Sequence, residues 1–321
     1  MDFRESRSEQ RSCAGMIGLV VTCSVTMIAF AANSILGRMA LRPHFGPDER
    51  VEVLSDPAIY TMIRITSGAL VLMLICWMRT RRDENVPSIK VNRWLMAWML
   101  TVYAVGFSFA YIQLDTASGT LILFAWVQLT MVLAGVFRNE IPNQWELGGV
   151  LLATLGLVYL VLPELQTPLI REAILMSVAG VAWGLYSFLG KGSVDPISDS
   201  AGNFIRAVPL VLVLGWLAVY CIPMSKNFDL PTTGIYLTPR GFLLAIVSGG
   251  LTSGVGYALW YRLLPRITAT QAAAVQLTVP IIAAVGGVFF ADDRLNGRIV
   301  MAGILIILGI GLTVFKKGAR P

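Results

Sequence analysis

Long apolar runs dominate this chain of 321 residues. Ten stretches of roughly 20 residues, the length that an α-helix needs to cross the hydrocarbon core of a bilayer, are separated by polar segments. The runs lack the strict alternation of a barrel strand, so helices are expected. The predicted helices are Gly15 to Ala40, Ala58 to Met78, Trp94 to Gln113, Thr116 to Phe137, Gln144 to Leu162, Ala173 to Gly190, Ala201 to Ile222, Gly241 to Tyr261, Thr268 to Phe290 and Gly297 to Phe315. With 56% hydrophobic and 14% charged residues, the chain is predicted to be an all-α membrane protein with ten transmembrane helices.

One tetrapeptide occurs twice within these runs. The sequence Val127-Gln128-Leu129-Thr130 recurs as Val275-Gln276-Leu277-Thr278, five predicted helices later. A duplicated unit with an odd number of helices inserts the second time in the opposite orientation, an arrangement typical of carriers. We therefore predict two inverted five-helix repeats, residues 15–165 and 166–315, between cytoplasmic tails 1–14 and 316–321. A second match, Gly135-Val136-Phe137 with Gly287-Val288-Phe289, has a spacing about four residues longer, which predicts a fourth helix about one turn shorter than the ninth.

The net charge of +6 is placed as membrane topology requires. If the N-terminus is cytoplasmic, the cytoplasmic segments carry about twice as many Lys and Arg residues as the opposite segments. Both termini are therefore predicted to lie in the cytoplasm, and nucleic acid is not needed to explain the charge. The four cysteines lack metal-binding spacing, and the one histidine, His44, lies in a loop, so no metal and no cofactor is expected.

Several of these residues carry a family resemblance. The stretch Phe30 to Arg38 is echoed by Trp183 to Lys191, and acidic residues, Glu140 and Asp293, follow the fourth and ninth helices. Together with Pro280 in the ninth helix, this pattern resembles the EamA-like branch of the drug/metabolite transporter superfamily. The chain departs from it in the fourth helix, which has Met131-Val132 where the family often has a proline. The resemblance implies a transporter of small metabolites, in a family whose substrates are diverse and include amino acids.

A carrier needs polar groups that face a cavity near the middle of the membrane, because such groups are costly toward lipid. Gln128 and Gln276 are the leading candidates. Pro280 has no N–H, so it leaves the carbonyl of Gln276 without its usual helical partner and marks a kink. The alternative is that each glutamine joins two helices by a hydrogen bond.

Aromatic side chains supply the other candidates for the wall of a binding site. Tyr103, Phe107 and Tyr257 are predicted to line it, whereas Trp260 and Tyr261 are assigned to the aromatic belt at the membrane surface. The remaining predicted members are Trp183 and Tyr186 in the sixth helix, Asn33, Ser34 and Arg38 in the first helix, and Gly254 as a hinge.

The charges embedded in the predicted helices are of one sign. Arg38, Arg64, Lys191 and Arg206 lie in or at helices, yet the interiors lack Asp and Glu apart from Glu146 near a helix start. A carboxylate-bearing substrate would supply the missing charge. Alternatively, Arg64 and Arg206 reach the headgroups or pair with Asp56 and Asp199 in neighbouring segments. The lack of an embedded carboxylate or histidine also predicts facilitated diffusion or exchange rather than proton coupling through such a group.

The sequence thus predicts a transporter, and not an enzyme. We expect it to move an amino acid or related organic compound outward across the cytoplasmic membrane by alternating access, as a monomer or homodimer. A sensor or scaffold that transports nothing is the alternative. An intramembrane enzyme is disfavoured, because His, Asp and Glu are missing from the apolar interiors.

Overall fold

A computed structural model describes residues 2–42, 44–45, 51–52, 54–80, 93–140, 143–161, 170–221, 236–293 and 297–315. Its helices are α1 (Asp2–Leu41), α2 (Pro57–Thr80), α3 (Arg93–Ala110), α4 (Thr116–Phe137), α5 (Gln144–Val161), α6 (Ile170–Gly190), α7 (Pro196–Cys221), α8 (Pro239–Val247), the π-helix η3 (Ser248–Val255), α9 (Gly256–Leu263), the 3₁₀-helix η4 (Leu264–Arg266), α10 (Ala269–Gln276), α11 (Thr278–Phe290) and α12 (Gly297–Phe315). Because α8 to η4 are continuous and α10 adjoins α11, these residues form ten helical segments. Seven are long and apolar enough to cross a membrane.

The predicted all-helical membrane fold is confirmed, with one small addition. A two-stranded antiparallel hairpin, β1 (His44–Phe45) and β2 (Val51–Glu52), follows α1. The predicted bounds of the fourth and tenth helices agree with α4 and α12. α1 begins at Asp2, within the predicted N-terminal tail, and the tail 316–321 lies outside the described residues.

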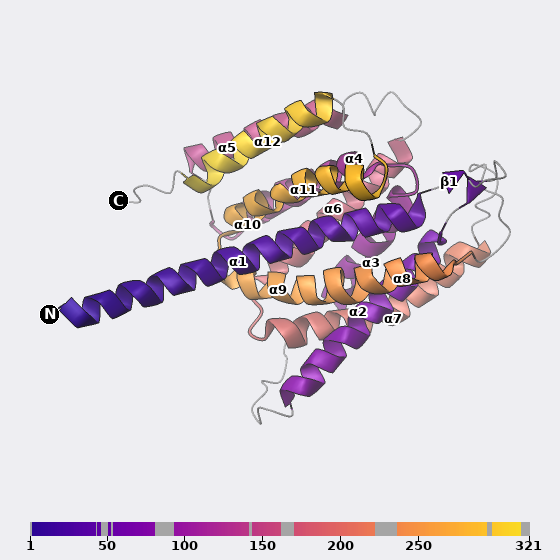
Figure 1. Ribbon diagram of the computed structural model, residues 1–321, viewed down its shortest axis with the longest axis horizontal. Helices are drawn as coiled ribbons and strands as arrows, with labels where there is room; N and C mark the ends of the chain where they lie inside the picture. The colour runs from indigo at the N-terminus through magenta and orange to yellow at the C-terminus, as the bar shows by residue number, and fades with distance from the viewer. Residues whose placement is uncertain are drawn as a thin grey trace.

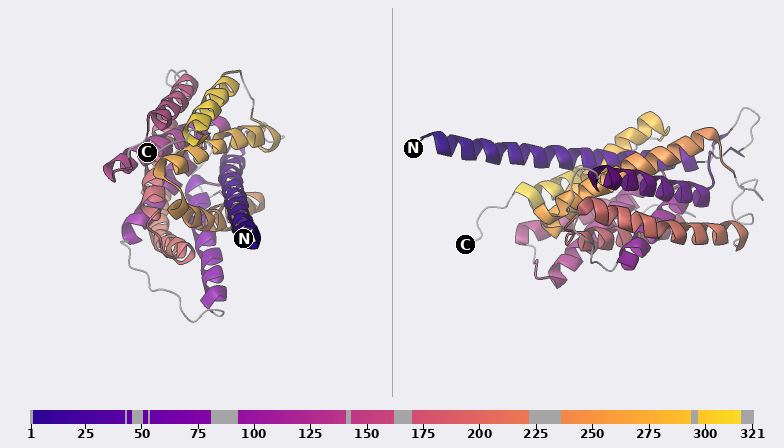
Figure 2. Two further views of the ribbon diagram at one scale, coloured as in Figure 1. Left: turned by 90° about the vertical axis from the view of Figure 1, so that its left-hand side faces the viewer. Right: turned by 90° about the horizontal axis from the view of Figure 1, so that it is seen from below.

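The helices pack as a bundle with two paired edges (Figure 1). α5 lies against α12 at one edge and α2 lies against α7 at the other. Between these edges, α6 contacts both α3 and α4. α1 crosses the bundle and contacts α9, η3 and α11. The first residues of α1 and the last residues of α12 lie at the same end of the bundle (Figures 1 and 2).

The distribution of side chains is that of a protein with a lipid-facing exterior. Large apolar side chains such as Leu70, Ile174 and Leu251 are more than half exposed, whereas Arg64 and Gln276 are fully buried. Water would favour the reverse arrangement, and hydrocarbon favours this one because buried polar groups then find partners inside the bundle.

The internal register differs from the prediction. The spans Thr116–Phe137 and Ala269–Phe290 both have 22 residues, so the prediction of a shorter fourth helix is wrong. Gln276 ends the eight-residue α10, whereas Gln128 lies beyond the middle of α4. The two copies of the tetrapeptide therefore occupy different positions in their helices. The residues at the helix ends repeat with a different spacing from the tetrapeptide. The separation along the chain from Asp115 to Thr268, the N-cap residues of α4 and α10, equals the separation from Glu140 to Asp293.

Candidate functional site

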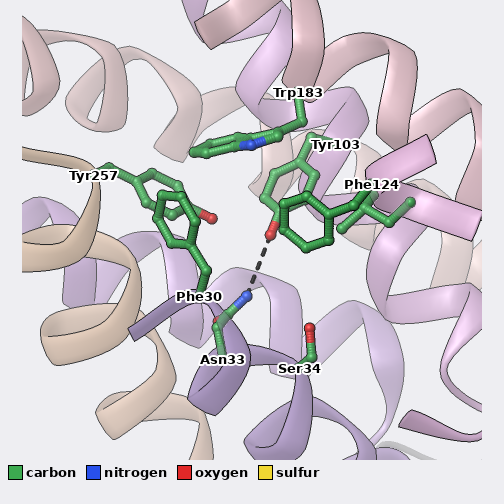
Figure 3. A pocket seen from close by; sticks show the side chains of 8 residues that line it. Phe30, Asn33, Ser34, Tyr103, Phe124, Trp183 and Tyr257 are labelled. Atoms are coloured by element: carbon green, nitrogen blue, oxygen red, sulfur yellow. Dashed lines mark hydrogen bonds between the residues drawn. The ribbon is translucent and has the colours of Figure 1, made fainter. Parts of the chain in front are cut away.

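A small enclosed cavity lies at the centre of the bundle, between helices from both halves of the sequence (Figure 3). Its volume is about 10 Å³, room for roughly one water molecule. The lining residues are Phe30, Asn33 and Ser34 of α1, Tyr103 of α3, Leu123 and Phe124 of α4, Trp183 of α6 and Tyr257 of α9. Five of the predicted binding residues, Asn33, Ser34, Tyr103, Trp183 and Tyr257, are thus brought together.

Aromatic rings form most of the cavity wall. Trp183 is central among them, with its ring centroid 4.5 Å from that of Tyr257, 5.0 Å from Tyr103 and 5.3 Å from Phe30. Tyr186 stacks on Trp183 from outside the cavity, at 5.4 Å. Phe30 and Ser34 share one face of α1 because they are four residues apart. Phe30 packs edge to face against Trp183 and Tyr257, while Tyr103 and Tyr257 are tilted against Trp183, and together these rings form an apolar wall.

Arg64 of α2 lies behind two of these tyrosines and is fully buried. Its Nη2 donates to the hydroxyl oxygens of Tyr103 and Tyr257, each at 3.0 Å, and its Nε donates to Ser253 Oγ at 3.1 Å. The guanidinium carbon is 4.6 Å from the centre of the Phe107 ring, which places this predicted residue beside Arg64 rather than in the cavity. Arg64 therefore neither reaches headgroups nor pairs with Asp56, and that interpretation is wrong.

Asn33 connects the cavity to the π-helix η3. Its Nδ2 donates to the Tyr103 hydroxyl at 3.2 Å, and its Oδ1 accepts from Ser248 at 2.7 Å and from Thr252 and Ser253 at 3.3 Å. A π-helix is rare and frequently occurs at functional sites. Sequence reasoning missed these three hydroxyl groups. The available signal was their concentration in the glycine-rich stretch 248–254.

Glycines allow η3 to approach α2 closely. A Cβ at Gly249 would overlap the backbone carbonyl of Arg64, and a Cβ at Gly254 would lie 3.2 Å from the carbonyl oxygen of Gly68. Gly254, the predicted hinge, thus lies within the π-helix at a tight contact between helices. That contact brings Ser253 within reach of Arg64.

The two glutamines lie outside the cavity lining. Gln276 is fully buried, and its Oε1 accepts from Trp183 Nε1 at 2.8 Å. Its Nε2 contacts Met131 Sδ and donates to the carbonyl of Ala272. Gln276 therefore joins helices and holds Trp183 in place. Gln128 is buried in α4, at 3% exposure, and makes no hydrogen bond with the part of the chain that the structure describes.

Pro280, the predicted kink, follows the interruption at Leu277 between α10 and α11, and it also lines a separate apolar groove beside α12. Two other residues lie elsewhere than sequence reasoning placed them. Trp260 and Tyr261 are buried, so their assignment to the aromatic belt is wrong. Trp260 Nε1 donates to Ser187 Oγ at 3.0 Å, and Tyr261 stacks on Tyr186 at 5.1 Å. The prediction failed because an apolar side chain has the same hydropathy whether it faces a neighbouring helix or lipid. Arg262, next to Tyr261, indicated the membrane surface in the sequence.

Arg38 lies at one end of the bundle, away from the cavity lining. Its Nε is 3.7 Å from Asp293 Oδ1, and its Nη1 donates to the carbonyl oxygens of Tyr111 and Ile112. Asp293 Oδ2 accepts from the backbone N–H of Thr116, the first residue of α4, at 2.9 Å. These contacts tie the ends of α1 and α11 to the start of α4.

A matching set of contacts lies at the other end of α4. Lys191 Nζ donates to Glu140 Oε1 at 2.5 Å and to Oε2 at 2.8 Å, and Glu140 Oε2 accepts from the N–H of Ala269, the first residue of α10. Partial burial opposes ionisation of Glu140, but the hydrogen bonds from Lys191 and Ala269 outweigh it and hold the pKa of this carboxyl below its usual value. A helix rises about 1.5 Å per residue, so the two sets are roughly 33 Å apart along the 22-residue α4.

An apolar exterior and ten helical segments in the described residues define a multi-pass integral membrane protein, and its bundle encloses a small central cavity with polar groups. The chain belongs to the EamA-like transporter family of the drug/metabolite transporter superfamily, and the family model matches residues 170–315. The predicted family is confirmed, and with it a membrane transporter whose partners are a small molecule and the lipid bilayer.

Known proteins resemble most of the chain. An uncharacterized protein of Pseudomonas aeruginosa is 40% identical over 296 residues, which cover 92% of this chain and 94% of that protein. An Escherichia coli protein named "Probable amino-acid metabolite efflux pump" is 24% identical over 245 residues, covering 71% of this chain and 78% of that protein. A crystal structure superposes with a TM-score of 0.65 at 16% identity, covering 91% of this chain and 97% of that chain, which shows a shared fold.

Proposed function

We propose that this transporter carries an amino acid or a related small organic compound outward across the cytoplasmic membrane. The observation that carries the proposal is the central cavity, which both halves of the sequence line with aromatic rings and with the polar groups of Asn33, Ser34 and the two tyrosines. A relative named for amino-acid metabolite efflux supports the substrate class and the direction.

The mechanism that we propose is alternating access between two inverted repeats. The contacts of Arg38 and Asp293 at one end of α4 match those of Lys191 and Glu140 at the other, down to the helix N-terminus that each acid caps. Each set would act as a latch that closes one side of the membrane. Both sets of contacts are formed and the cavity has a volume of about 10 Å³, which supports assigning the structure to a closed state between the two proposed open ones.

Orientation follows from the same arrangement. The start of α1 and the end of α12 lie at one end of the bundle (Figure 1), and the excess of basic residues in the predicted cytoplasmic segments supports a cytoplasmic location for that end. Monomer and homodimer stay open as predictions. No cofactor is part of the proposed cycle, and exchange driven by the substrate's own gradient is the expected mode.

Counterflow in proteoliposomes tests the proposal. Protein reconstituted with amino acids, organic acids and organic cations inside is expected to accumulate the labelled form of its substrate. Asn33→Leu should abolish counterflow, because it removes the link between Tyr103 and η3. Thr154→Ala is the control, because the Thr154 hydroxyl bonds the carbonyl of Val150 within its own helix α5. Folded protein without counterflow of any solute would support the sensor or scaffold instead.

A further inference from the structure

We propose that the central cavity selects the carboxylate of its substrate, and that Arg64 is the residue that makes this choice. The inference rests on the proposed function and names its substrate class. It depends on the hydrogen-bonding capacity of the site, on where the charge of Arg64 reaches the cavity, and on a second pair of tyrosines that is held without a charge.

Arg64 has more donors than the described residues satisfy. A guanidinium has five N–H groups. Those on Nε and Nη2 reach three hydroxyl oxygens, whereas the fully buried Nη1 has no hydrogen-bond partner, and no carboxylate lies within 4 Å, among the residues that the structure describes. A buried charge of this kind is stabilised when an opposite charge binds beside it.

Tyr103 and Tyr257 bring this charge to the cavity. Figure 3 shows both hydroxyl groups directed into the space that the lining residues enclose. The Tyr103 oxygen already accepts from Arg64 Nη2 and from Asn33 Nδ2, so both of its lone pairs are used and its own proton is left to donate. Asn33 Oδ1 accepts from three hydroxyl groups. The polar side of the cavity therefore offers donors under a positive charge, which suits a carboxylate.

A structural role alone does not explain the charge, because a neutral residue holds a second pair of tyrosines. Asn203 of α7, like Arg64 of α2, lies about two turns after the proline that begins its helix. Its Nδ2 donates to the hydroxyl groups of Tyr186 at 3.3 Å and Tyr261 at 3.4 Å. An amide is thus sufficient to hold two tyrosines, and the guanidinium stands only where the tyrosines line the cavity.

The other embedded cations lie away from the cavity lining. Arg38 and Lys191 have the carboxylates of Asp293 and Glu140, whereas Arg206 is half-buried and donates to the carbonyl of Gly202 in its own helix. Of these four cations, Arg64 is the one that is fully buried without a carboxylate partner among the described residues, and its single charge matches a monoanion better than a dianionic phosphate. The aromatic wall suits an apolar or aromatic remainder. The substrate class is therefore a monocarboxylate, with an amino group tolerated but not required.

Binding to two charge series of otherwise similar compounds tests the inference. The first is alanine, propanoate and alaninamide, and the second is phenylalanine, 3-phenylpropanoate and phenylalaninamide. Each is added as a chloride or sodium salt at equal ionic strength to the full protein in lipid nanodiscs, and the melting temperature is measured. In at least one series, we expect the amino acid and the carboxylic acid, which both carry a carboxylate, to raise the melting temperature. We expect neither alaninamide nor phenylalaninamide to raise it.

Two variants of Arg64 and one control variant locate the selection. Arg64→Gln should lose the preference for acids, whereas Arg64→Lys should keep it at lower affinity, and Arg206→Gln, at the half-buried arginine of α7, should behave as the unmodified protein. If Arg64→Gln misfolds, the test still stands, because the preference of the unmodified protein for acids and the lower affinity of Arg64→Lys for the same acids can be measured without it. Stabilisation by an amide equal to that by its acid, or by none of the six compounds, overturns the inference.

The outcomes separate this inference from the proposed function. Acid-selective binding without counterflow would overturn transport and leave the carboxylate site. Counterflow of an amine or amide that no acid inhibits would leave transport and overturn the carboxylate site.

Discussion

The proposed latches predict that removing either acid opens one side of the protein. Glu140→Gln keeps the shape of the side chain but removes its charge from Lys191 and from the N-terminus of α10. The side chains of Lys191 and Glu140 are 14% and 34% exposed, so the pair has the modest strength of a partly solvated ion pair. Such a pair contributes about 0.2–1 kcal/mol, and a charge at a helix N-terminus about 0.3–1 kcal/mol. Their loss should raise the population open at that end by roughly 2- to 30-fold.

Cysteine labelling measures the opening. In a background without the native cysteines, a cysteine replaces either Leu264 or Leu114, which are 0% and 1% exposed and lie near the Glu140 and Asp293 ends respectively. Glu140→Gln should speed maleimide labelling at Leu264→Cys but not at Leu114→Cys, and Asp293→Asn should do the reverse. Equal labelling of both reporters in both variants would refute the latch reasoning, because the acids would then have no role in closure.

The same pair gives a pH dependence with a definite sign. The pKa of Glu140 is lower in the folded protein than its usual value. Its contribution to stability is therefore complete above the usual carboxylate pKa and is lost as the pH falls through the lowered value. The difference in melting temperature between the unmodified protein and Glu140→Gln should be constant at neutral pH and should shrink in acid. A difference that grows in acid would contradict the assignment.

Two further substitutions test the packing around the site. Gln276→Leu leaves Trp183 Nε1 buried without an acceptor, so it should lower the free energy of unfolding by about 1–3 kcal/mol. Gln128→Leu, the control, should lower it little. Thermal unfolding in detergent measures both, and equal losses would count against the Trp183 bond. Gly249→Ala places a methyl group against the α2 backbone and should destabilise by about 1–3 kcal/mol, while Gly148→Ala, where a Cβ meets nothing within 4 Å, should not; similar melting temperatures for the two would argue against the close contact of η3 with α2.

The helical fold was predictable because bilayer thickness leaves its mark directly on the sequence. Apolar runs of about 20 residues placed every helical segment, and the bounds of α4 and α12 needed no correction. The π-helix was not predictable in this way. Ser248 and Ser253 take their positions from a π-helix, in which each backbone hydrogen bond joins residues five apart. Such bonding produces no characteristic pattern of apolar residues in the sequence.

The candidate site was predictable in its residue types and not in its geometry. Trp183, Asn33 and Tyr103 stood out as polar or aromatic groups inside apolar helices, and the cavity brings them together. Arg64 stood out as a charge, but only the packing of α2 against η3 shows that it contacts Tyr103 rather than the membrane surface. The repeated tetrapeptide misled about register, because short apolar matches recur easily in membrane helices, whereas the spacing of the caps reflects the lengths of whole elements.

The two ends of the bundle carry similar pairs of charged residues, whereas the residues near its centre differ between the two halves of the sequence. Both features are expected of a carrier. For two open states to be populated in one cycle, closing either side must cost a similar free energy, so similar latches at Glu140 and Asp293 are expected. A single substrate has no twofold symmetry, so the groups that bind it need not be duplicated. Arg64 stands on α2 where α7 has Asn203, and this difference in charge falls beside the cavity. Exchanging the two residues should therefore impair substrate selection while leaving the latches, and the labelling rates that report on them, unchanged.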